Sequence, residues 1–415
     1  MNAQTEDENA ALDCPLPWPR PGEGYGLGRP PFRDEQTGYW VVSTYSDVER
    51  VLLDPETFSS EYSIGPDRED VFAPLQARAS EDPSAAVALN YSRFPIVSDD
   101  GEVHRRERSY VGKAFTPKRV RKFELLITSL CDELTDAMVG RREVPFLEGF
   151  AVPLPVKVIA HGLGVPAEDY LLLKRWSDGF QGIIGVPQPC AEVMETFVKT
   201  AVEFTEYITP LIEERREAPG EDLISLLAAE GSDGRRQSTE EVLSHTKALL
   251  LGGNKTTTAA LAGTMLYLVR SPDLQETVRA DPTRIPALVE EGLRLSTPVQ
   301  VMYRTATVDT EVAGVTVAAG EHVMMRCAAA DRDEAQFDNP LGPRVDRPDG
   351  RHLAFGRGIH VCPGAPLARA ELRIALQTLL ARTSSITLSD RDDPVVAVGN
   401  LPTATLGELY IDVHA

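Results

Sequence analysis

The feature that most constrains the fold of this chain is one long helical pattern at residues 238–271. It starts with a capping box, Ser238-Thr239-Glu240-Glu241, in which a hydroxyl and a carboxylate satisfy free backbone amides. It continues without a break until Pro272, which stops a helix. Since each helical residue adds about 1.5 Å, roughly 33 residues span about 50 Å. A helix of that length has to cross the whole molecule.

The centre of this pattern is unusual for a helix, because it reads Gly252-Gly253-Asn254-Lys255-Thr256-Thr257-Thr258. Each Gly in a helix interior costs about 1 kcal/mol relative to Ala. Two adjacent glycines therefore indicate that another group lies close to the backbone. That group is either a second helix in tight packing or a bound molecule, and the residues alone leave both interpretations open.

The remaining helical patterns predict a mainly α protein. Apolar positions recur at spacings of four, three, four and four from Phe123, which predicts a helix with one buried face. Further helices are predicted at 168–186, 191–217, 221–229 and 285–296, with a last long helix from Pro363 to Thr383.

Strands and irregular segments account for the other residues. Aromatic and β-branched residues at 38–48 predict a strand, and the short helix after it is stopped by Pro55. Residues 304–325, with Ala-Gly turns, predict β-hairpins. Residues 62–96 show no clear periodicity and are expected to form a long loop with a short helix, a common form for an access element. Residues 327–363 are irregular.

Composition and cysteine spacing narrow the class of protein. With 42% hydrophobic and 25% charged residues, residues 1–415 are expected to form one globular domain. Its β-rich part is expected within about 30–60 and 299–326, and the rest should be helical. None of the five cysteines forms a C-x-x-C pair, which disfavours a disulfide framework or a structural zinc site. The acidic N-terminus and the lack of a long apolar stretch predict a cytosolic protein with no membrane anchor.

The distribution of charge bears on possible partners. A net charge of -21 disfavours nucleic acid, because a polyanion needs a matching basic surface. The segment 104–122 opposes this trend, with eight Lys or Arg residues and a single acid, Glu107. It is either a solvated helix face or a docking patch for an acidic partner or an anionic cofactor.

The strongest chemical signal lies just before the last helix, where Cys362 ends the glycine-rich stretch HLAFGRGIHVC. Free backbone amides and the positive end of the helix favour a thiolate there, by roughly 0.3–1 kcal/mol. Gly356, Gly358 and Gly364 allow tight turns and the close approach of a large planar group. A thiolate on such a loop is a suitable ligand for haem iron, which itself would supply most of the preference for the thiolate.

The string FGRGIHVCPGAPLAR resembles the cysteine-loop signature of the cytochrome P-450 family at every position that defines it. A buried inert cysteine or a protease-type nucleophile, the usual interpretations of a lone cysteine, does not explain such a string. The resemblance implies that Cys362 binds the iron of haem b and that Phe355, His360 and Gly364 belong to the same site.

A second group of matches is similar to the buried charge cluster that fixes the cysteine loop in this family. Glu291 and Arg294 resemble its Glu-x-x-Arg pair, whose spacing of three puts both side chains on one helix face. Arg347 fits the third member. The resemblance implies a structural role for all three.

A third group is similar to the residues that the family directs at the haem propionates. His104 and Arg108 lie four residues apart on one helix face, and Arg304 and His360 match further partners. Four cationic or polar donors around two carboxylates give sensible charge compensation.

The resemblance covers essentially the whole chain and implies a cytochrome P-450 fold, with haem between the long central helix and the cysteine-loop helix. The implied reaction inserts one oxygen atom of dioxygen into a small or medium apolar substrate. Electrons would come from a ferredoxin and its ferredoxin reductase, with docking on the basic segment and Arg357. The substrate pocket is expected to be lined mostly by apolar residues, namely Phe94, Leu249, Gly252, Gly253, Val299, Val301, Met302 and Leu401.

In one place the chain departs from the family, whose central helix usually reads Ala-Gly-x-acid-Thr. The alcohol is retained as Thr256, with Thr257 as the alternative alignment, but the acid is replaced by Lys255. Thr256 and Lys255 are thus the candidate catalytic residues for proton delivery. A cation cannot relay protons as a carboxylate does unless desolvation lowers its pKa. Alternatively, Lys255 points away from the haem into a salt bridge.

Three functions follow from these residues. The signature favours a ferredoxin-dependent monooxygenase. Lys255 leaves open a haem-thiolate enzyme with atypical chemistry, such as peroxide use, ring coupling, nitration or dehydration. A haem-binding sensor is the third, and it would show ligand-induced spectral changes without a product.

Overall fold

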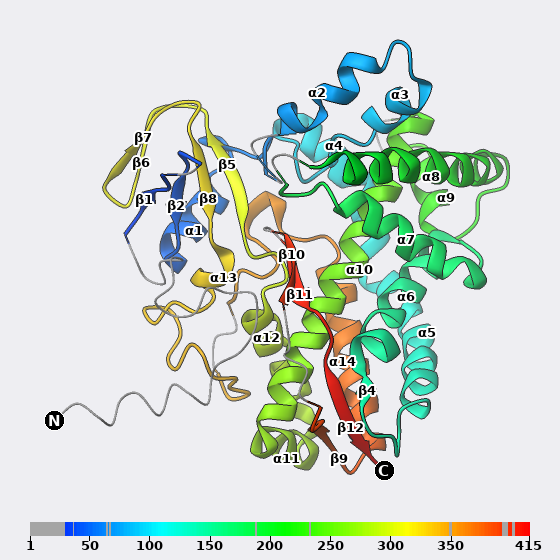
Figure 1. The fold of residues 1–415 in the computed structure, drawn as a ribbon, viewed down its shortest axis with the longest axis vertical. Coiled ribbons are helices and arrows are strands. Elements are labelled where there is room, and N and C mark those ends of the chain that lie inside the picture. The colour runs from blue at the N-terminus through cyan, green and yellow to red at the C-terminus, as the bar shows by residue number, and fades with distance from the viewer. Residues whose placement is uncertain are drawn as a thin grey trace.

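The long central helix is the axis of the fold. In this computed structural model, which describes residues 30–35, 37–63, 65, 68–186, 189–231, 234–347, 351–391, 397–400 and 403–415, it appears as α10 (Thr239–Arg270). The predicted capping box is present, because Ser238 Oγ accepts from the Glu241 N–H and the Glu241 carboxylate accepts from the Ser238 N–H. Figure 1 shows α10 passing between the β-rich part and helices α5 to α9.

Several helices pack on α10 and complete a mainly helical body. Its contacts include α6 (Pro153–Leu163), α7 (Tyr170–Gln181), α12 (Ile285–Ser296) and α14 (Ala365–Arg382). The other helices are α1 (Tyr45–Leu53), α2 (Arg68–Arg78), α3 (Pro83–Leu89), α4 (Gly101–Gly112), α5 (Pro117–Asp136), α8 (Ala191–Glu217), α9 (Leu223–Ala228), α11 (Pro272–Ala280) and α13 (Cys327–Ala330). Among the described residues no helix is both long and apolar enough to cross a membrane.

The largest sheet has five strands in the order β1-β2-β8-β5-β3 and lies to one side of α10 (Figure 1). Its strands are β1 (Phe32–Arg33), β2 (Trp40–Val42), β8 (His322–Met325), β5 (Met302–Ala306) and β3 (Phe58–Ser59). β2 and β8 run parallel, and the other neighbours are antiparallel. Smaller sheets pair β6 (Thr310–Val312) with β7 (Val315–Val317), β10 (Ala397–Asn400) with β11 (Thr403–Leu406), and β4 (Val144–Pro145) with β12 (Tyr410–His414) and β9 (Ser385–Leu388).

The sequence predictions hold best where a helix carries its own start and stop signals. The helices predicted at 191–217 and 285–296 have those bounds in the structure. The strand predicted at 38–48 is wrong in its extent, because β2 ends at Val42 and Thr44 caps α1 with its side chain. Residues 62–96 contain two helices, α2 and α3, rather than one; Pro74 lies inside α2, which obscured its pattern.

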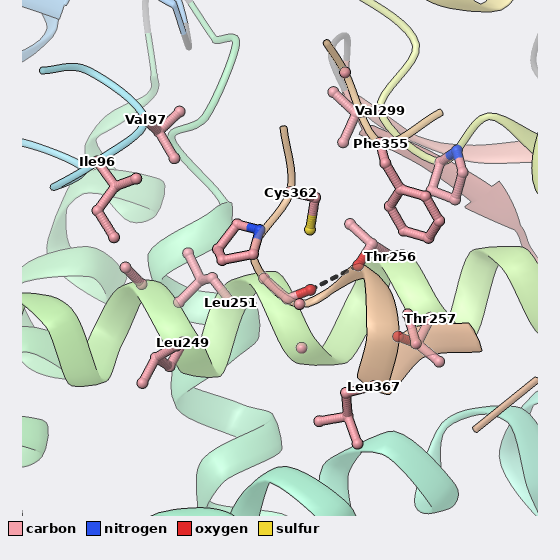
Figure 2. Close-up of a pocket in the computed structure, with 18 of the residues that line it drawn as sticks. Ile96, Val97, Leu249, Leu251, Thr256, Thr257, Val299, Phe355, Cys362 and Leu367 are labelled. Atoms are coloured by element: carbon pink, nitrogen blue, oxygen red, sulfur yellow. Dashed lines mark hydrogen bonds between the residues drawn. The ribbon is translucent and has the colours of Figure 1, made fainter. Parts of the chain in front are cut away.

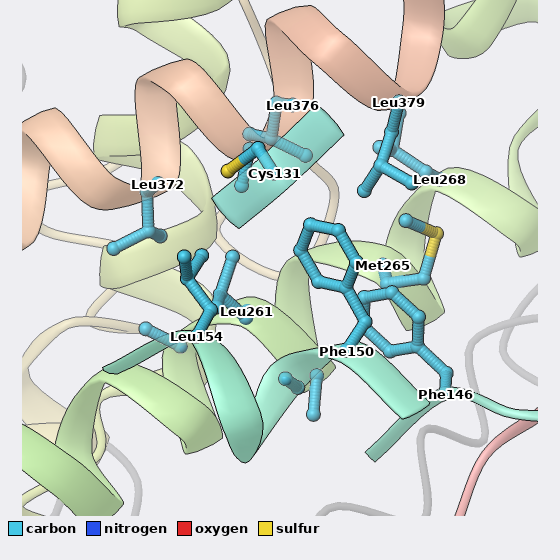
Figure 3. Packing of buried hydrophobic residues seen from close by; sticks show 14 of the residues in the cluster. Cys131, Phe146, Phe150, Leu154, Leu261, Met265, Leu268, Leu372, Leu376 and Leu379 are labelled. Atoms are coloured by element: carbon cyan, nitrogen blue, oxygen red, sulfur yellow. The ribbon is translucent and has the colours of Figure 1, made fainter. Parts of the chain in front are cut away.

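One apolar cluster joins α10 to α14 and α5 (Figure 3). Leu261, Met265 and Leu268 of α10 belong to this cluster. The partners labelled in Figure 3 are Leu372, Leu376 and Leu379 of α14, Cys131 of α5, and Phe146, Phe150 and Leu154. Phe146 and Phe150 stack with their ring centroids 5.5 Å apart. Because α14 begins just after Cys362, this core fixes the cysteine loop relative to the central helix.

The carboxylate of Glu291 on α12 lies at the centre of a buried charge cluster. It accepts hydrogen bonds from Arg294 at 2.8 and 2.9 Å and from Arg347 Nε at 3.0 Å. Burial would raise the pKa of Glu291, but the hydrogen bonds and charge of Arg294 outweigh burial and hold the pKa below its ordinary value. Nη1 of Arg294 donates to the carbonyls of Asp331 and Pro340. The cluster therefore also stabilises the irregular segment before the cysteine loop.

Replacing Glu291 with Ala removes the carboxylate that Arg294 and Arg347 share. Arg294 is fully buried, so its charge would lose its partner, and we expect the free energy of unfolding to fall by about 3–5 kcal/mol. Urea unfolding followed by circular dichroism measures this. The control is Glu276→Ala on the exposed face of α11, which we expect to change stability by less than about 0.5 kcal/mol. Equal stabilities for the two variants would contradict the role assigned to Glu291.

Candidate active site

Cys362 lies in a tight loop that leads into α14. Its backbone N–H donates to the Phe355 carbonyl at 2.9 Å, and Gly356 and Gly358 have φ angles of 68° and 67°. A Cβ at Gly358 would lie 2.8 Å from the Leu52 carbonyl oxygen, so this position requires glycine. The glycines thus allow the chain to turn tightly enough to bring Cys362 to the wall of a cavity.

The Cys362 thiol lines the cavity, and its surroundings shift its pKa in opposite directions. Burial raises the pKa of Cys362, while the backbone amides of Gly364 and Ala365 and the positive charges of Arg108 and Arg369 act in the other direction. Burial is the larger influence and disfavours the thiolate, whereas coordination to a metal ion favours it.

The cysteine loop and α10 line a common cavity of about 330 Å³. Figure 2 shows Cys362 together with Leu249, Leu251, Thr256 and Thr257 of α10 on its lining. The predicted pocket residues that line it are Phe94, Leu249, Gly252, Gly253, Val299, Val301 and Met302. Leu401, which was also predicted, lies outside the described residues. The predicted haem-site residues Phe355 and Gly364 are on the lining too.

One end of the site gathers buried donors. Both ring nitrogens of His104, Nη1 of Arg108 and Nδ1 of His360 are buried without a hydrogen-bond partner among the described residues. The rings of His104 and His360 lie 4.2 Å apart, and the Nε2 of His360 is 2.9 Å from Ser60 Oγ. Burial, helped by the positive charges of His360 and Arg108, lowers the pKa of His104 to about 4.

Arg304 is the fourth predicted donor and, like His104, does not itself line the cavity, whereas Arg108 and His360 do. Its side chain is 2% exposed and donates to the Tyr303 carbonyl at 2.8 Å, and burial lowers its pKa to about 10. Neither Arg304 nor Arg108 forms an ion pair with a described carboxylate. Buried cations and donors without anionic partners fit a cofactor that brings its own carboxylates.

The two alcohols of the central helix and the lysine just before them point to different surroundings. Thr256 lines the cavity, as does Thr257, and Thr256 Oγ1 donates to the Gly252 carbonyl at 2.7 Å. Lys255 does not line it. The Nζ of Lys255 lies 3.4 Å from Asp178 of α7, which also accepts from Lys174 at 2.6 Å. This arrangement favours the interpretation in which Lys255 points away from the haem into a salt bridge.

Sequence reasoning missed Lys247, a fully buried lysine on α10. Its Nζ donates to the carbonyls of Tyr91 and Arg93 at 2.8 and 2.7 Å and lies 3.9 Å from the ring centre of Phe94. Burial lowers the pKa of Lys247 to about 7. Its contacts fasten the segment that continues into the cavity wall. A sequence signal existed, because Lys247 lies one turn from Leu243 and Leu251 on a buried face.

Glu371 is a second buried polar residue that the sequence did not single out. It lines the cavity from α14, and its Oε2 has no hydrogen-bond partner among the described residues. Burial raises the pKa of Glu371 well above its ordinary value, because the charged carboxylate loses its solvation. The signal was again a charged residue one turn from apolar Leu367 and Ala375 on the same helix.

Comparison with known proteins agrees with this geometry. The family model described as Cytochrome P450 matches residues 180–401. A steroid C26-monooxygenase of Mycolicibacterium smegmatis is 36% identical over 88% of this chain and 85% of its own length. Cytochrome P450 109 of Bacillus spizizenii is 33% identical over 86% of this chain and 82% of its own length. The chain belongs to the cytochrome P450 family.

The solved structures agree with that assignment. CYP109E1 of Bacillus megaterium, solved in complex with corticosterone, matches with a TM-score of 0.79 and 31% identity over 93% of this chain and 95% of its own. The mostly helical body with small sheets is therefore the P450 fold, as predicted. The enzyme is an oxidoreductase of the monooxygenase kind, and its family uses haem.

Proposed function

We propose that this P450 binds haem b through Cys362 and hydroxylates an apolar organic substrate with electrons from a ferredoxin. The observation that carries the proposal is the single cavity on which the Cys362 sulfur, the Thr256 hydroxyl and a largely apolar wall come together. Haem, when bound, supplies the iron at which dioxygen is reduced and one of its oxygen atoms is transferred to the substrate. The protein supplies the ligand, the charge compensation, the substrate wall and the protons.

Four side chains would hold the carboxylates of haem b. His104 and Arg108 come from α4, His360 from the cysteine loop and Arg304 from β5. The ring nitrogens of His104, Nη1 of Arg108 and Nδ1 of His360 have no hydrogen-bond partner among the described residues, and propionate oxygens would provide charge-assisted hydrogen bonds to them. Gly364 lies next to the sulfur, since a Cβ at this position would be 3.8 Å from Cys362 Sγ.

The substrate is proposed to be a small or medium apolar molecule. Most of the wall that surrounds it is aliphatic or aromatic, with Ile96, Leu249, Val299 and Met302 among its members. The M. smegmatis relative is named a steroid monooxygenase, and the B. megaterium structure holds corticosterone. These names support an apolar ring system as the substrate class.

Protons are proposed to reach the reaction through Thr256 rather than Lys255. Thr256 Oγ1 lies on the cavity wall and donates its hydrogen bond to the Gly252 carbonyl. Its lone pairs therefore remain able to accept a hydrogen bond from a neighbouring proton donor. Glu371 lies on α14 on the side of Cys362, so haem bound between α10 and α14 would separate it from Thr256. Lys255 is directed at Asp178 on the outside of α10. The replacement of the family's acid by a lysine therefore does not require atypical chemistry.

The ferredoxin is proposed to dock on the basic segment 104–122. Lys113, Lys118 and Arg121 are exposed and have no ion-pair partner among the described residues, which leaves their charge available to an acidic protein. Other cations of the segment are already engaged, since Arg106 pairs with Glu107 and Lys122 with Glu221. Arg357, included in the predicted patch, lies 3.3 Å from Glu49.

Cys362→Ala tests the ligand assignment. The purified wild-type protein should be red, and its reduced form should give the strongly red-shifted carbon monoxide band of thiolate ligation. We expect the variant to lose that band because the sulfur is gone. Cys190→Ala, at an exposed cysteine, should keep it. A Cys362→Ala protein that retains the band would overturn the assignment.

Charge reversal tests the docking site. We expect Lys113→Glu with Lys118→Glu to slow reduction by a ferredoxin severalfold at low salt, because the two lysines would no longer attract an acidic protein. Added salt should reduce this difference, since charges are screened beyond about 10 Å at 0.1 M ionic strength. Stopped-flow reduction of the haem measures the rate. Arg78→Glu with Lys199→Glu changes the net charge equally on α2 and α8 and should leave the rate unchanged. If both pairs slow reduction alike, only the net charge matters and the site lies elsewhere.

The proposed proton path predicts different effects for Lys255→Met and Thr256→Val. The Lys255 ion pair is half-exposed, so its loss should cost less than about 1 kcal/mol and leave the fraction of electrons lost as hydrogen peroxide unchanged. Thr256→Val is nearly isosteric but removes the hydroxyl, and that fraction should rise. The measurement is peroxide formed per NADH consumed, with a ligand that shifts the Soret band. The reverse pattern would assign proton delivery to Lys255.

A further inference from the structure

Gln181, at the C-terminal end of α7, is a polar side chain that the protein leaves unsatisfied in the substrate cavity. It lines the cavity and is 8% exposed, and its Oε1 is buried without a hydrogen-bond partner among the described residues. A buried carbonyl-type oxygen that makes no hydrogen bond is costly. An unsatisfied buried group in a native structure calls for an explanation, and a bound molecule that supplies the missing partner is one.

The packing of α7 aims Gln181 into the cavity. Gly179 lies against α8, because a Cβ there would come within 2.1 Å of Thr200 Oγ1. Residues two apart on a helix project about 200° from one another, so Gln181 faces away from α8. Phe180 between them is held by ring contacts with Tyr91 and Phe204 at 5.2 and 5.4 Å. The direction of the carboxamide is therefore set by the backbone.

Several other polar groups on the cavity lining already have hydrogen-bond partners or a proposed role in holding haem. Ser63 Oγ donates to the Val97 carbonyl at 2.8 Å and Thr256 Oγ1 to the Gly252 carbonyl at 2.7 Å. Arg108 and His360 lie with the donors proposed to hold the haem carboxylates. Ile184, one turn after Gln181, is an apolar part of the same wall. Gln181 thus presents a hydrogen-bond acceptor within an apolar stretch of the cavity.

We propose that Gln181 selects the substrate: its Oε1 accepts a hydrogen bond from a hydroxyl or N–H group on an otherwise apolar molecule. This inference rests on the proposed function, and it narrows the substrate class from apolar compounds to apolar alcohols or amines. An unsubstituted hydrocarbon would fill the cavity and exclude water, which leaves Oε1 without any partner. An alcohol of the same shape would satisfy it.

The test uses haem-loaded protein and three probes of one shape, trans-decalin, trans-2-decalol and trans-2-decalone. Dissociation constants are measured by isothermal titration calorimetry, and the Soret shift confirms that each probe reaches the cavity. The variant is Gln181→Met, which keeps the length of the side chain without its hydrogen bond. Ile184→Val is the matched control on the same wall.

We expect the ratio of alcohol to hydrocarbon affinity to be about tenfold larger in the wild type than in Gln181→Met, from the loss of one buried hydrogen bond. Ile184→Val should weaken all three probes by similar factors and leave the ratio unchanged. An equal ratio in wild type and Gln181→Met overturns the inference while the proposed function stands. Tighter binding of the ketone than of the alcohol by the wild type would mean that the carboxamide presents its N–H, and would overturn the donor requirement. If no probe binds the wild type, the apolar cavity itself fails as the substrate site.

Discussion

The geometry of the active site depends on the ion pairs that the buried carboxylate of Glu291 forms with two arginines. The carboxylate joins Arg294 on its own helix to Arg347, which follows some fifty residues later in an irregular segment. Arg294 reaches the carbonyl of Asp331, and the Asp331 side chain accepts from the Leu353 N–H at 2.6 Å, at the start of the cysteine loop. A loop without regular secondary structure has few hydrogen bonds of its own. Here buried charge supplies them, at the cost of desolvating every member of the cluster.

Above this support the site is built from two kinds of wall. The cysteine loop and α4 bring a sulfur and cationic donors, whereas the 94–97 segment, α10 and the residues around Val299 bring mostly apolar side chains. Lys247 fastens the stretch before that segment to α10 through two backbone carbonyls. Ile96 has a φ of 72°, which a β-branched residue rarely adopts, and its N–H donates to Asp99 at 2.8 Å. The substrate wall is thus held in a strained form by polar contacts behind it.

The exceptions within the apolar wall carry the specific chemistry. Thr256 brings a hydroxyl from α10, and Gln181 brings an unpartnered amide oxygen at the end of α7. Lys255 replaces the acid of the family pattern, yet its ion pair with Asp178 lies outside the cavity. In a helix, residues one apart project about 100° from each other, so the neighbours Lys255 and Thr256 can serve different surfaces. The substitution of the acid by Lys255 is therefore compatible with ordinary oxygen insertion.

The sequence by itself determined what local chemistry can encode. The capping box and Pro272 set the bounds of α10, the glycines of the cysteine loop allowed its turn, and the spacing of three put Glu291 and Arg294 on one face. Only the tertiary structure decided which way a given side chain faces. Lys247, Glu371 and Gln181 are each one polar residue on a helix, and whether such a residue meets solvent, an ion pair or a cavity depends on what packs against that face. The same holds for α2 and α3, whose weak local patterns are stabilised by packing against neighbouring elements rather than by helix propensity. Burial is a property of contacts between distant segments, and that is why it could not be settled from the chain alone.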